Sequence, residues 1–302
     1  MAAEVLGSLL PKDGGVYFDG TVGGGGHSER LLAAADTLVI AADKDAEATA
    51  YAADRLKPYG KRVTIVHDDF KNAPVFLKAL GVDRLDGVLL DLGVSGRQID
   101  EGERGFSYLK DAPLDMRMDR RQSFTAQELV NCYKEEELRR VIAEYGEERH
   151  ARKIAAVIVR RRAQKKIETT AELSQITASA AHFDPRAGHP AKRVFQALRI
   201  EVNGELDGLG EAIRFLAGSL KAGGRITVIS FHSLEDRIVK QTYQYLERSC
   251  LCPPKLPVCV CGKRREVKIL TKKPVLPTAQ EIKDNPRAQS AKLRTAERIE
   301  GQ

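Results

Sequence analysis

Short apolar runs rich in β-branched residues recur through the early part of the chain and return near residue 225. Such runs, bounded by polar or glycine residues, are typical of strands buried in a parallel sheet. Helical spacing of apolar residues separates the first four runs, which predicts helices on both faces of that sheet. The expected strands are VYFD (16–19), TLVIAAD (37–43), VTIVHDD (63–69), LDGVLLDLG (85–93) and RITVISFH (225–232).

The stretch between the fourth and fifth predicted strands is far longer than a crossover requires, since about a dozen residues suffice. The helical spacing of VNGELDGLGEAIRFLAGSL supplies the crossover helix just before the fifth strand. Residues 104–199 carry further helical patterns and many charges but few strand signals. We therefore expect an all-helical domain at 104–199, inserted into an α/β domain formed by 1–103 and 200–302.

The segment after the fifth predicted strand begins with SLEDRIVKQTYQYLERS, an amphipathic helical pattern for which Ser233 is the expected N-cap. A basic tail punctuated by prolines follows it. Within the inserted domain, Cys132 stands alone in a helical pattern and is expected to be a small core residue.

Basic residues gather in two regions of a chain whose net charge is +7, from 49 basic and 42 acidic residues. Residues 149–167 hold eight Lys or Arg and no acid, and residues 262–302 hold eleven against five acids. Such regions are compatible with a polyanion partner such as nucleic acid, and equally with solvated charged faces.

No apolar run approaches the roughly 18 residues that a membrane helix needs. The N-terminal stretch MAAEVLGSLL lacks the basic region that opens a signal peptide. The expected location is therefore the cytoplasm.

A glycine-rich loop, DGTVGGGGHS (19–28), follows the first predicted strand, at the sheet edge where nucleotide-like cofactors bind. It lacks the Gly-Lys-Ser/Thr of a phosphate-binding P-loop. A dinucleotide and S-adenosylmethionine both remain open. In either case Asp43, at the end of the second strand, is placed to accept hydrogen bonds from ribose hydroxyls.

S-adenosylmethionine suits the other strand ends. Glycines without Cβ let the methionine part approach the loop. Asp68, Asp69 and Phe70 at the third strand can flank the adenine, and Asp91 at the fourth then lies beside the reacting methyl group. The alternative is that these acids only cap helices and that His27 only begins one.

Four cysteines stand within twelve residues: Cys250, Cys252, Cys259 and Cys261. A cytoplasmic chain argues against structural disulfides. A tetrahedral zinc site and a loop of reduced thiols both remain open, because the single-residue gaps are tighter than the usual two-residue knuckle. Whether the chain binds a metal is therefore left undecided.

Longer motifs identify a family. They are DGTVGGGGHS (19–28), LLDLGVSGRQID (89–100), ERGFSY (103–108), PLDMRMD (113–119), YGEER (145–149), RVFQALRIEVNGEL (193–206), ISFHSLEDRIVK (229–240) and NPRAQSAKLRTAER (285–298). In this order, over nearly the whole chain, they resemble the bacterial 16S ribosomal RNA cytosine-N4 methyltransferases, the RsmH (MraW) family.

This resemblance implies a class I S-adenosylmethionine-dependent methyltransferase fold with an inserted helical domain for substrate recognition. It also implies methyl transfer to the exocyclic N4 of one cytidine in the decoding region of 16S rRNA, within the small ribosomal subunit. The cofactor contacts that it implies are Gly25, Gly26, His27, Asp43, Phe70, Asp91 and Gln98.

Two features depart from the family pattern. Family members usually begin with a His-x-Pro-Val segment, whereas this chain begins MAAEVLGSLL, so residues that would cover the cofactor are expected to be missing. Gly96 stands where a serine is common, which is expected to loosen a loop near the reacting atoms.

The expected chemistry needs a hydrogen-bond acceptor, because the lone pair of the cytosine amine is delocalised into the ring. Asp91 is the first candidate for that acceptor, and its alternative role is to hold the ammonium group of the cofactor. Phe231 and Phe106 are candidates for stacking a base that has left its helix. His232 can contact the base or a phosphate, and ordinary packing is the alternative for it and for Phe231.

Arg117, Arg149 and Arg199 are candidate phosphate contacts. Two rival functions are a dehydrogenase that uses NAD and a non-catalytic RNA-binding factor. The glycine loop and the strand-end acids argue against the second, because a pure binding protein does not need them.

Overall fold

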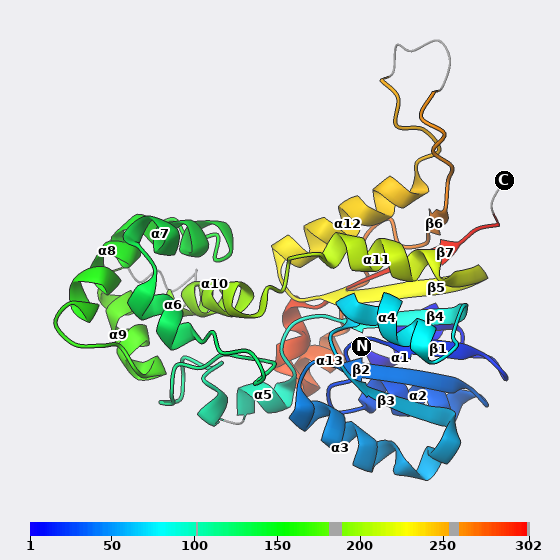
Figure 1. The fold of residues 1–302 in the computed structure, drawn as a ribbon, viewed down its shortest axis with the longest axis horizontal. Helices are drawn as coiled ribbons and strands as arrows, with labels where there is room; N and C mark the ends of the chain where they lie inside the picture. The colour runs from blue at the N-terminus through cyan, green and yellow to red at the C-terminus, as the bar shows by residue number, and fades with distance from the viewer. Residues whose placement is uncertain (101, 181–188, 254–259, 301–302) are drawn as a thin grey trace. The chain divides into compact units, whose positions relative to one another are not determined.

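The computed structural model describes residues 1–100, 102–180, 189–253 and 260–300. These residues form two compact units, Met1–Gly93 with Leu206–Gln302, and Val94–Glu205 (Figure 1). The second unit begins ten residues before the start expected for the inserted domain and ends six residues after its expected end.

The first unit is built on one seven-stranded sheet with the order β3-β2-β1-β4-β5-β7-β6. Strands β1 to β5 are parallel, and β7 runs antiparallel to both β5 and β6. The predicted α/β class with a mostly parallel sheet is confirmed. The strands are β1 Val16–Asp19, β2 Leu38–Asp43, β3 Val63–His67, β4 Leu85–Asp91, β5 Leu220–Ser230, β6 Val267–Ile269 and β7 Lys292–Arg298.

Both faces of the sheet are covered by helices, as the side-chain alternation of a strand requires. On β4, Val88 and Leu90 join the core beneath α4, α11 and α12, whereas Leu89 joins the core beneath α1, α2 and α3. The helices of this unit are α1 Ala2–Leu9, α2 Gly26–Ala34, α3 Ala46–Leu56, α4 Ala73–Ala79, α11 Leu209–Gly218, α12 Ser233–Glu247 and α13 Ala279–Asp284.

The strand register brings several polar strand ends to one edge. Asp19 of β1 pairs with Ala41 of β2, two residues before Asp43, and Asp91 of β4 pairs with Ile229 of β5. Because these strands are parallel, their carboxyl ends and the loops that follow them lie along the same edge of the sheet. This edge carries the candidate site.

The second unit is helical. Hydrogen bonds between side chains and the backbone join three of its motifs. Buried Arg104 donates to the carbonyls of Arg117 and Met118, and Asn203 exchanges hydrogen bonds with the backbone of Met116 and Met118. Cys132 is exposed at the end of α6, so the expectation of a core position is wrong. The helices are α5 Gly96–Asp100, α6 Ala126–Cys132, α7 Glu135–Glu144, α8 Ala151–Arg162, α9 Thr170–Ala180 and α10 Ala191–Asn203.

Across both units, no helix within the described ranges has the length and apolar character needed to cross a bilayer.

Candidate functional site

Two structural causes, packing and backbone conformation, account for part of the glycines in the loop between β1 and α2. A Cβ on Gly20 would lie 2.6 Å from Leu90 and 2.8 Å from Phe70, so packing requires glycine there. Gly23 and Gly25 have φ of 48° and 75°, the left-handed region that glycine adopts without strain. A Cβ on Gly24 would meet nothing nearer than 3.8 Å. Clearance for a ligand therefore explains only part of the glycine run.

Asp19 ends β1 as a buried carboxylate inside this loop. Its two oxygens accept hydrogen bonds from Ser28 Oγ at 2.7 Å and from the backbone N–H of Thr21 at 3.2 Å. Burial raises the pKa of Asp19 to about 6, although both hydrogen bonds favour the charged form. Asp19 therefore holds the two ends of the loop in place through Thr21 and Ser28.

Asp43 ties the end of β2 to the same loop. Its Oδ2 accepts from the backbone N–H of Gly23 and its Oδ1 from that of Asp45, both at 2.9 Å. Burial raises the pKa of Asp43, and the two amides oppose this shift. Each carboxylate oxygen has a second lone pair, so two ribose hydroxyls can still be accepted.

His27, in the first turn of α2, faces Asp91 at the end of β4, with 3.5 Å between Nε2 and Oδ2. Burial alone would lower the pKa of His27, but the hydrogen bond and the charge of Asp91 outweigh it, and the pKa is raised. His27 Nδ1 and Asp91 Oδ1 are buried and have no hydrogen-bonding partner within the described part of the chain. Such atoms are rare in folded proteins and mark a place where a ligand or water completes the structure.

Two of the acids after β3 are occupied in turns. Asp69 caps the short turn Phe70–Asn72 by accepting from the N–H of Lys71, and Asp68 accepts from the Asn72 side chain. Asp69 therefore has the capping contact that was the alternative to a cofactor role for the strand-end acids. Phe70 is half-buried, its Cβ lies against the position that a Cβ on Gly20 would occupy, and its side chain packs on the core beneath α4 and α11.

At the end of β5, His232 is the N-cap of α12, with Nδ1 accepting from the N–H of Glu235, so the expected N-cap Ser233 is wrong. The imidazole takes this place because Ser233 already has helical backbone geometry as the first residue of α12. His232 Nε2 is buried and lies 3.2 Å from Oε1 of the buried Glu235, although it forms no hydrogen bond with any described residue. Phe231 packs against the core under α1, and its N–H donates to Glu235.

The remaining predicted residues belong to the second unit. Gln98, in α5, is buried. Its side chain accepts a hydrogen bond from the backbone N–H of Ser95, and Ser95 Oγ accepts one from the backbone N–H of Gln98. Phe106 packs against the helical core, beneath the Arg104 guanidinium. The structure thus gathers Gly25, Gly26, His27, Asp43, Phe70, Asp91, Phe231 and His232 in the first unit, without Gln98.

The candidate phosphate contacts differ in how far they are occupied. Arg117 forms a two-pronged ion pair with Asp115, and Arg199 forms one with Glu205, all at 2.8 or 2.9 Å. Arg149 is exposed.

Residues 1–299 match the family described as the MraW methylase family. The chain is also 50% identical over 300 residues to ribosomal RNA small subunit methyltransferase H of Clostridium botulinum (strain Loch Maree / Type A3), with 98% of this chain and 96% of that protein covered. The chain belongs to the MraW methylase family. Proteins with the same name from Caldicellulosiruptor saccharolyticus and Carboxydothermus hydrogenoformans are each 50% identical to it, covering 96% and 98% of this chain and 95% and 96% of their own lengths.

Membership of the MraW methylase family confirms the resemblance seen in the motifs. The sheet and its helices form the class I methyltransferase fold, and the cofactor is S-adenosyl-L-methionine. The site fits that cofactor, because a carboxylate with spare lone pairs, an open glycine loop and two unpartnered polar atoms line one sheet edge.

Two hydroxyl residues of the loop were missed. Thr21 Oγ1 accepts from the N–H of Asp91 at 2.6 Å, which joins the loop to the end of β4, and Ser28 holds Asp19. Their place inside DGTVGGGGHS is the one signal that could have found them, since hydroxyl residues in loops are otherwise common.

Proposed function

We propose that this MraW-family methyltransferase transfers a methyl group to the exocyclic N4 of one cytidine in the decoding region of 16S rRNA, within the small ribosomal subunit and in the cytoplasm. The name shared by the 50% identical relatives supports small-subunit rRNA as the substrate. The observation that carries the proposal is the pair His27 and Asp91, with an unpartnered polar atom on each, at the edge where the methyl group would be transferred.

Asp43, Phe70, Gly25, Gly26 and His27 have the cofactor-binding roles. Asp43 Oδ1 and Oδ2 are oriented by backbone amides, which is the arrangement needed to receive two ribose hydroxyls. Phe70 is half-buried with its Cβ beside Gly20 of the loop, and we assign its ring to the adenine. When bound, S-adenosylmethionine supplies an electrophilic methyl group on a sulfonium, which is a good leaving group. Gln98 keeps its proposed cofactor role on the motif alone.

Asp91 has the central catalytic role in this proposal. Its Oδ2 faces His27, whereas its buried Oδ1 is available to accept a hydrogen bond from the N4 amine of cytosine. That bond would return electron density to nitrogen as it attacks, and fixed alignment would add the larger part of the rate, up to about 7–11 kcal/mol. Holding the cofactor ammonium is the alternative role of the same atom.

Phe231 and His232 would meet the substrate at the end of β5. The Nε2 of His232, which lies 3.2 Å from Glu235 Oε1 and forms no hydrogen bond with any described residue, is the ring atom that we assign to the base or to a phosphate. Phe231 sits at the same strand end with its ring partly in the core, so stacking a base would use its remaining exposed face. The helical unit is assigned to recognition of the rRNA.

Methyl transfer to 16S rRNA tests the proposal. Purified protein would be given labelled S-adenosylmethionine with free 16S rRNA and with assembled small subunits, and the modified nucleoside would be identified by mass spectrometry. We expect N4-methylcytidine at one position in the decoding region. Asp91→Ala should abolish it, whereas Asp36→Ala, which removes an exposed acid of the first unit outside the site, should leave it unchanged.

Three results would contradict the proposal. They are a methyl group on another atom or RNA, binding of NAD in place of S-adenosylmethionine, and near wild-type activity in Asp91→Ala. RNA binding without transfer of any methyl group would favour the non-catalytic factor.

A further inference from the structure

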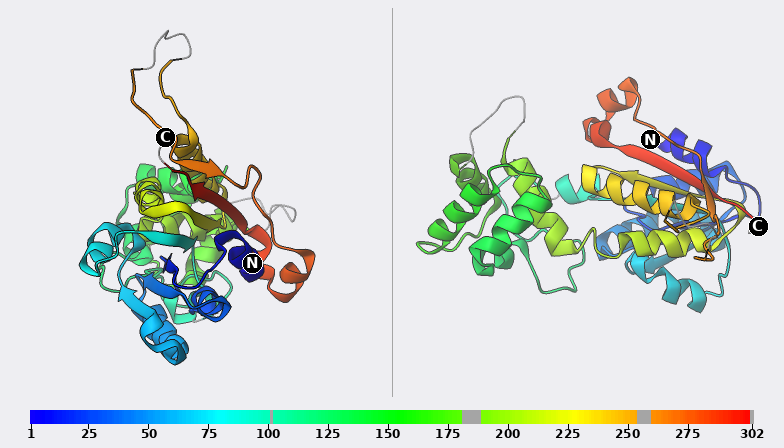
Figure 2. Two further views of the ribbon diagram at one scale, coloured as in Figure 1. Left: turned by 90° about the vertical axis from the view of Figure 1, so that its right-hand side faces the viewer. Right: turned by 90° about the horizontal axis from the view of Figure 1, so that it is seen from above.

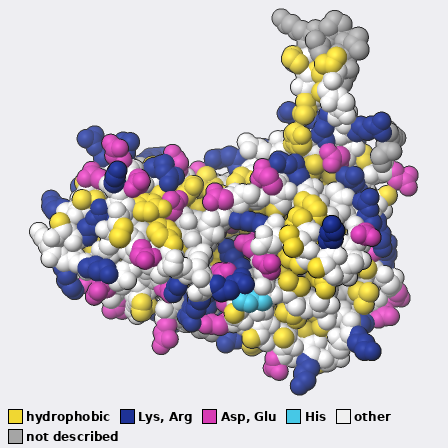
Figure 3. Space-filling model, in the orientation of Figure 1, with side chains coloured by type: hydrophobic (Ala, Val, Ile, Leu, Met, Phe, Trp, Pro, Cys, Tyr) yellow, Lys and Arg dark blue, Asp and Glu magenta, His cyan; other side chains and the backbone are white. Residues whose placement is uncertain are grey.

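Residues 248–253 follow the end of α12 and residues 260–265 lead to the start of β6, and we name these two described segments together the cysteine arm. It projects from the body of the first unit (Figures 1 and 2), and basic side chains gather around its base (Figure 3). The described parts are 248–253, which lead outward, and 260–265, which return. Cys259 lies outside the described residues.

The described part of the cysteine arm has no apolar core. Every described residue in it is exposed or half-buried, and even Leu251 and Val260 are 41% and 79% exposed. Its base is tied down by a hydrogen bond from Glu266 N–H to the Leu246 carbonyl and by the Arg265–Glu247 ion pair. Beyond that base, a segment that buries so little apolar surface needs a cross-link to hold one conformation.

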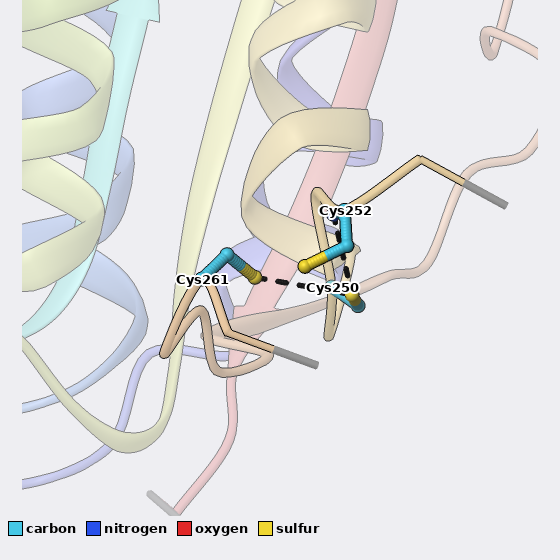
Figure 4. Close-up of side chains that lie close together, drawn as sticks. All are labelled: Cys250, Cys252 and Cys261. Atoms are coloured by element: carbon cyan, nitrogen blue, oxygen red, sulfur yellow. Dashed lines mark hydrogen bonds between the residues drawn. The ribbon is translucent and has the colours of Figure 1, made fainter. Parts of the chain in front are cut away.

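Three cysteine sulfurs converge where such a cross-link would act. The Sγ atoms of Cys250, Cys252 and Cys261 all lie within 4.8 Å of one another, and those of Cys250 and Cys261 are 3.8 Å apart (Figure 4). A tetrahedral zinc site, with Zn–S bonds of about 2.3 Å, places its sulfurs about 3.8 Å apart. A disulfide would require about 2.05 Å.

Backbone amides point at each of the three sulfurs. The N–H of Cys252 donates to Cys250 Sγ, that of Leu251 to Cys261 Sγ, and that of Val260 to Cys252 Sγ, over 3.3 to 3.4 Å. Donors of this kind favour the thiolate over the thiol, and thiolate is the form that binds a metal. Two of these bonds also join the outgoing to the returning part of the arm.

We propose that Cys250, Cys252 and Cys261 bind one Zn²⁺ ion as thiolates, and that this structural site fastens the two parts of the cysteine arm. Each thiol gives its proton to solvent as its sulfur binds the metal, so no oxidant or reductant is needed. The site follows the C-terminal end of α12, a helix about 22 Å long by its 15 residues, whereas the methyl-transfer edge lies at its N-terminal end. The zinc therefore serves the arm and not the reaction.

Zinc content of the full-length protein tests this site. After purification with a reductant, incubation with ZnCl₂ and desalting, we expect about one Zn²⁺ per chain by plasma mass spectrometry. Replacing the zinc with Co²⁺ should give the intense visible bands of a tetrahedral site and a thiolate-to-cobalt charge-transfer band. Cys250→Ser/Cys252→Ser should lose both the metal and the bands, whereas Cys132→Ser, which alters the cysteine of α6, should keep them.

A second readout follows the arm itself. Chelation of the metal should speed tryptic cleavage at Lys263, Arg264 and Arg265, and added Zn²⁺ should slow it again. Unchanged thermal unfolding of the rest of the chain would show that the double variant is folded. A wild-type zinc content near zero, equal content in the double variant, or cleavage unaffected by chelation would each overturn the proposal. These measurements do not depend on methyl transfer, so they stand apart from the proposed function.

Discussion

At one edge of the sheet, burial and the neighbouring Asp91 carboxylate have opposite effects on the pKa of His27. Burial disfavours a charged imidazole, yet the carboxylate at 3.5 Å reverses the balance and raises the pKa of His27. The folded state therefore holds the His27 proton more tightly than the unfolded chain. The stabilisation from this pair is fully present below the ordinary histidine pKa of about 6.5 and is lost as the pH rises through the raised value.

Asp91→Asn should lower the pKa of His27, because it removes the charge that offsets burial. The measurement is an NMR titration of the imidazole signals of the six histidines, assigned with His27→Gln. Asp69→Asn removes a carboxylate that caps a turn after β3 and should leave the pKa of His27 where it is. An unchanged His27 pKa in Asp91→Asn would show that the two side chains are not coupled.

Asp19 should affect the pH dependence of stability in the direction opposite to that of an ordinary ion-paired aspartate, because its pKa is raised and not lowered. Because burial raises its pKa to about 6, the folded state binds its proton more tightly, and its contribution to stability falls as the pH rises from about 4 to about 6. Asp19→Asn lacks this dependence. Relative to wild type, the free energy of unfolding of Asp19→Asn should therefore gain about 1–3 kcal/mol between pH 4 and pH 7. Urea unfolding across that range measures the gain, and a flat difference would contradict it.

At the scale of elements, the least expected feature is β7, which lies between β5 and β6 in a segment that reads as a basic tail. Its sequence, KLRTAER, carries four charged residues, so it lacks the apolar run of a buried strand. Arg294 of β7 is buried and pairs with Asp236 of α12 at 2.6 Å. Burial alone would raise the pKa of Asp236, but Arg294 and Lys292 lower it.

Asp236→Asn should destabilise the first unit by about 3 kcal/mol, because it leaves the buried Arg294 charge without its carboxylate. Glu297→Gln is the matched control: it breaks the more exposed Arg225–Glu297 pair between β5 and β7, and should cost about 0–1 kcal/mol. Urea unfolding at pH 7 compares the two. The pKa of Asp236 is lowered, so its stabilisation is present above the ordinary aspartate pKa and is lost as the pH falls through the lowered value. Equal losses in the two variants would refute a special role for this pair.

At the scale of the whole molecule, binding of the proposed rRNA partner depends on which basic side chains are free to contact its phosphates. Arg117 and Arg199, expected as contacts from their motifs, are engaged by Asp115 and Glu205. Arg160 and Arg161 of α8 are exposed, and neither forms an ion pair with another residue that the structure describes. The basic run of the inserted unit is therefore a better candidate than Arg117 or Arg199 for contacts with the phosphate backbone of the RNA.

Arg160→Glu/Arg161→Glu should weaken binding to 16S rRNA and reduce the slope of log K against log salt by about 1–2, since each lost phosphate contact removes about 0.7–0.9. Lys57→Glu/Lys61→Glu reverses two exposed charges beside α3 in the first unit and should leave the slope unchanged. Filter binding over a salt series measures both. If the two double variants shift the slope equally, α8 is only a solvated face.

The chain by itself determined the features that rest on local pattern. Apolar runs marked β1 to β5, and the polar residues that close them placed Asp19, Asp43 and Asp91 at one edge, because parallel strands end together. Motif resemblance added the family and the cofactor. The tertiary structure decided what depends on partners distant in sequence: the place of β7, the His27–Asp91 pair, the ion pairs that occupy Arg117 and Arg199, and the convergence of three cysteine sulfurs. Residue spacing sets which side chains share a face or an edge, whereas the contacts of a buried charge or a thiol are set only when the segments that carry them have packed.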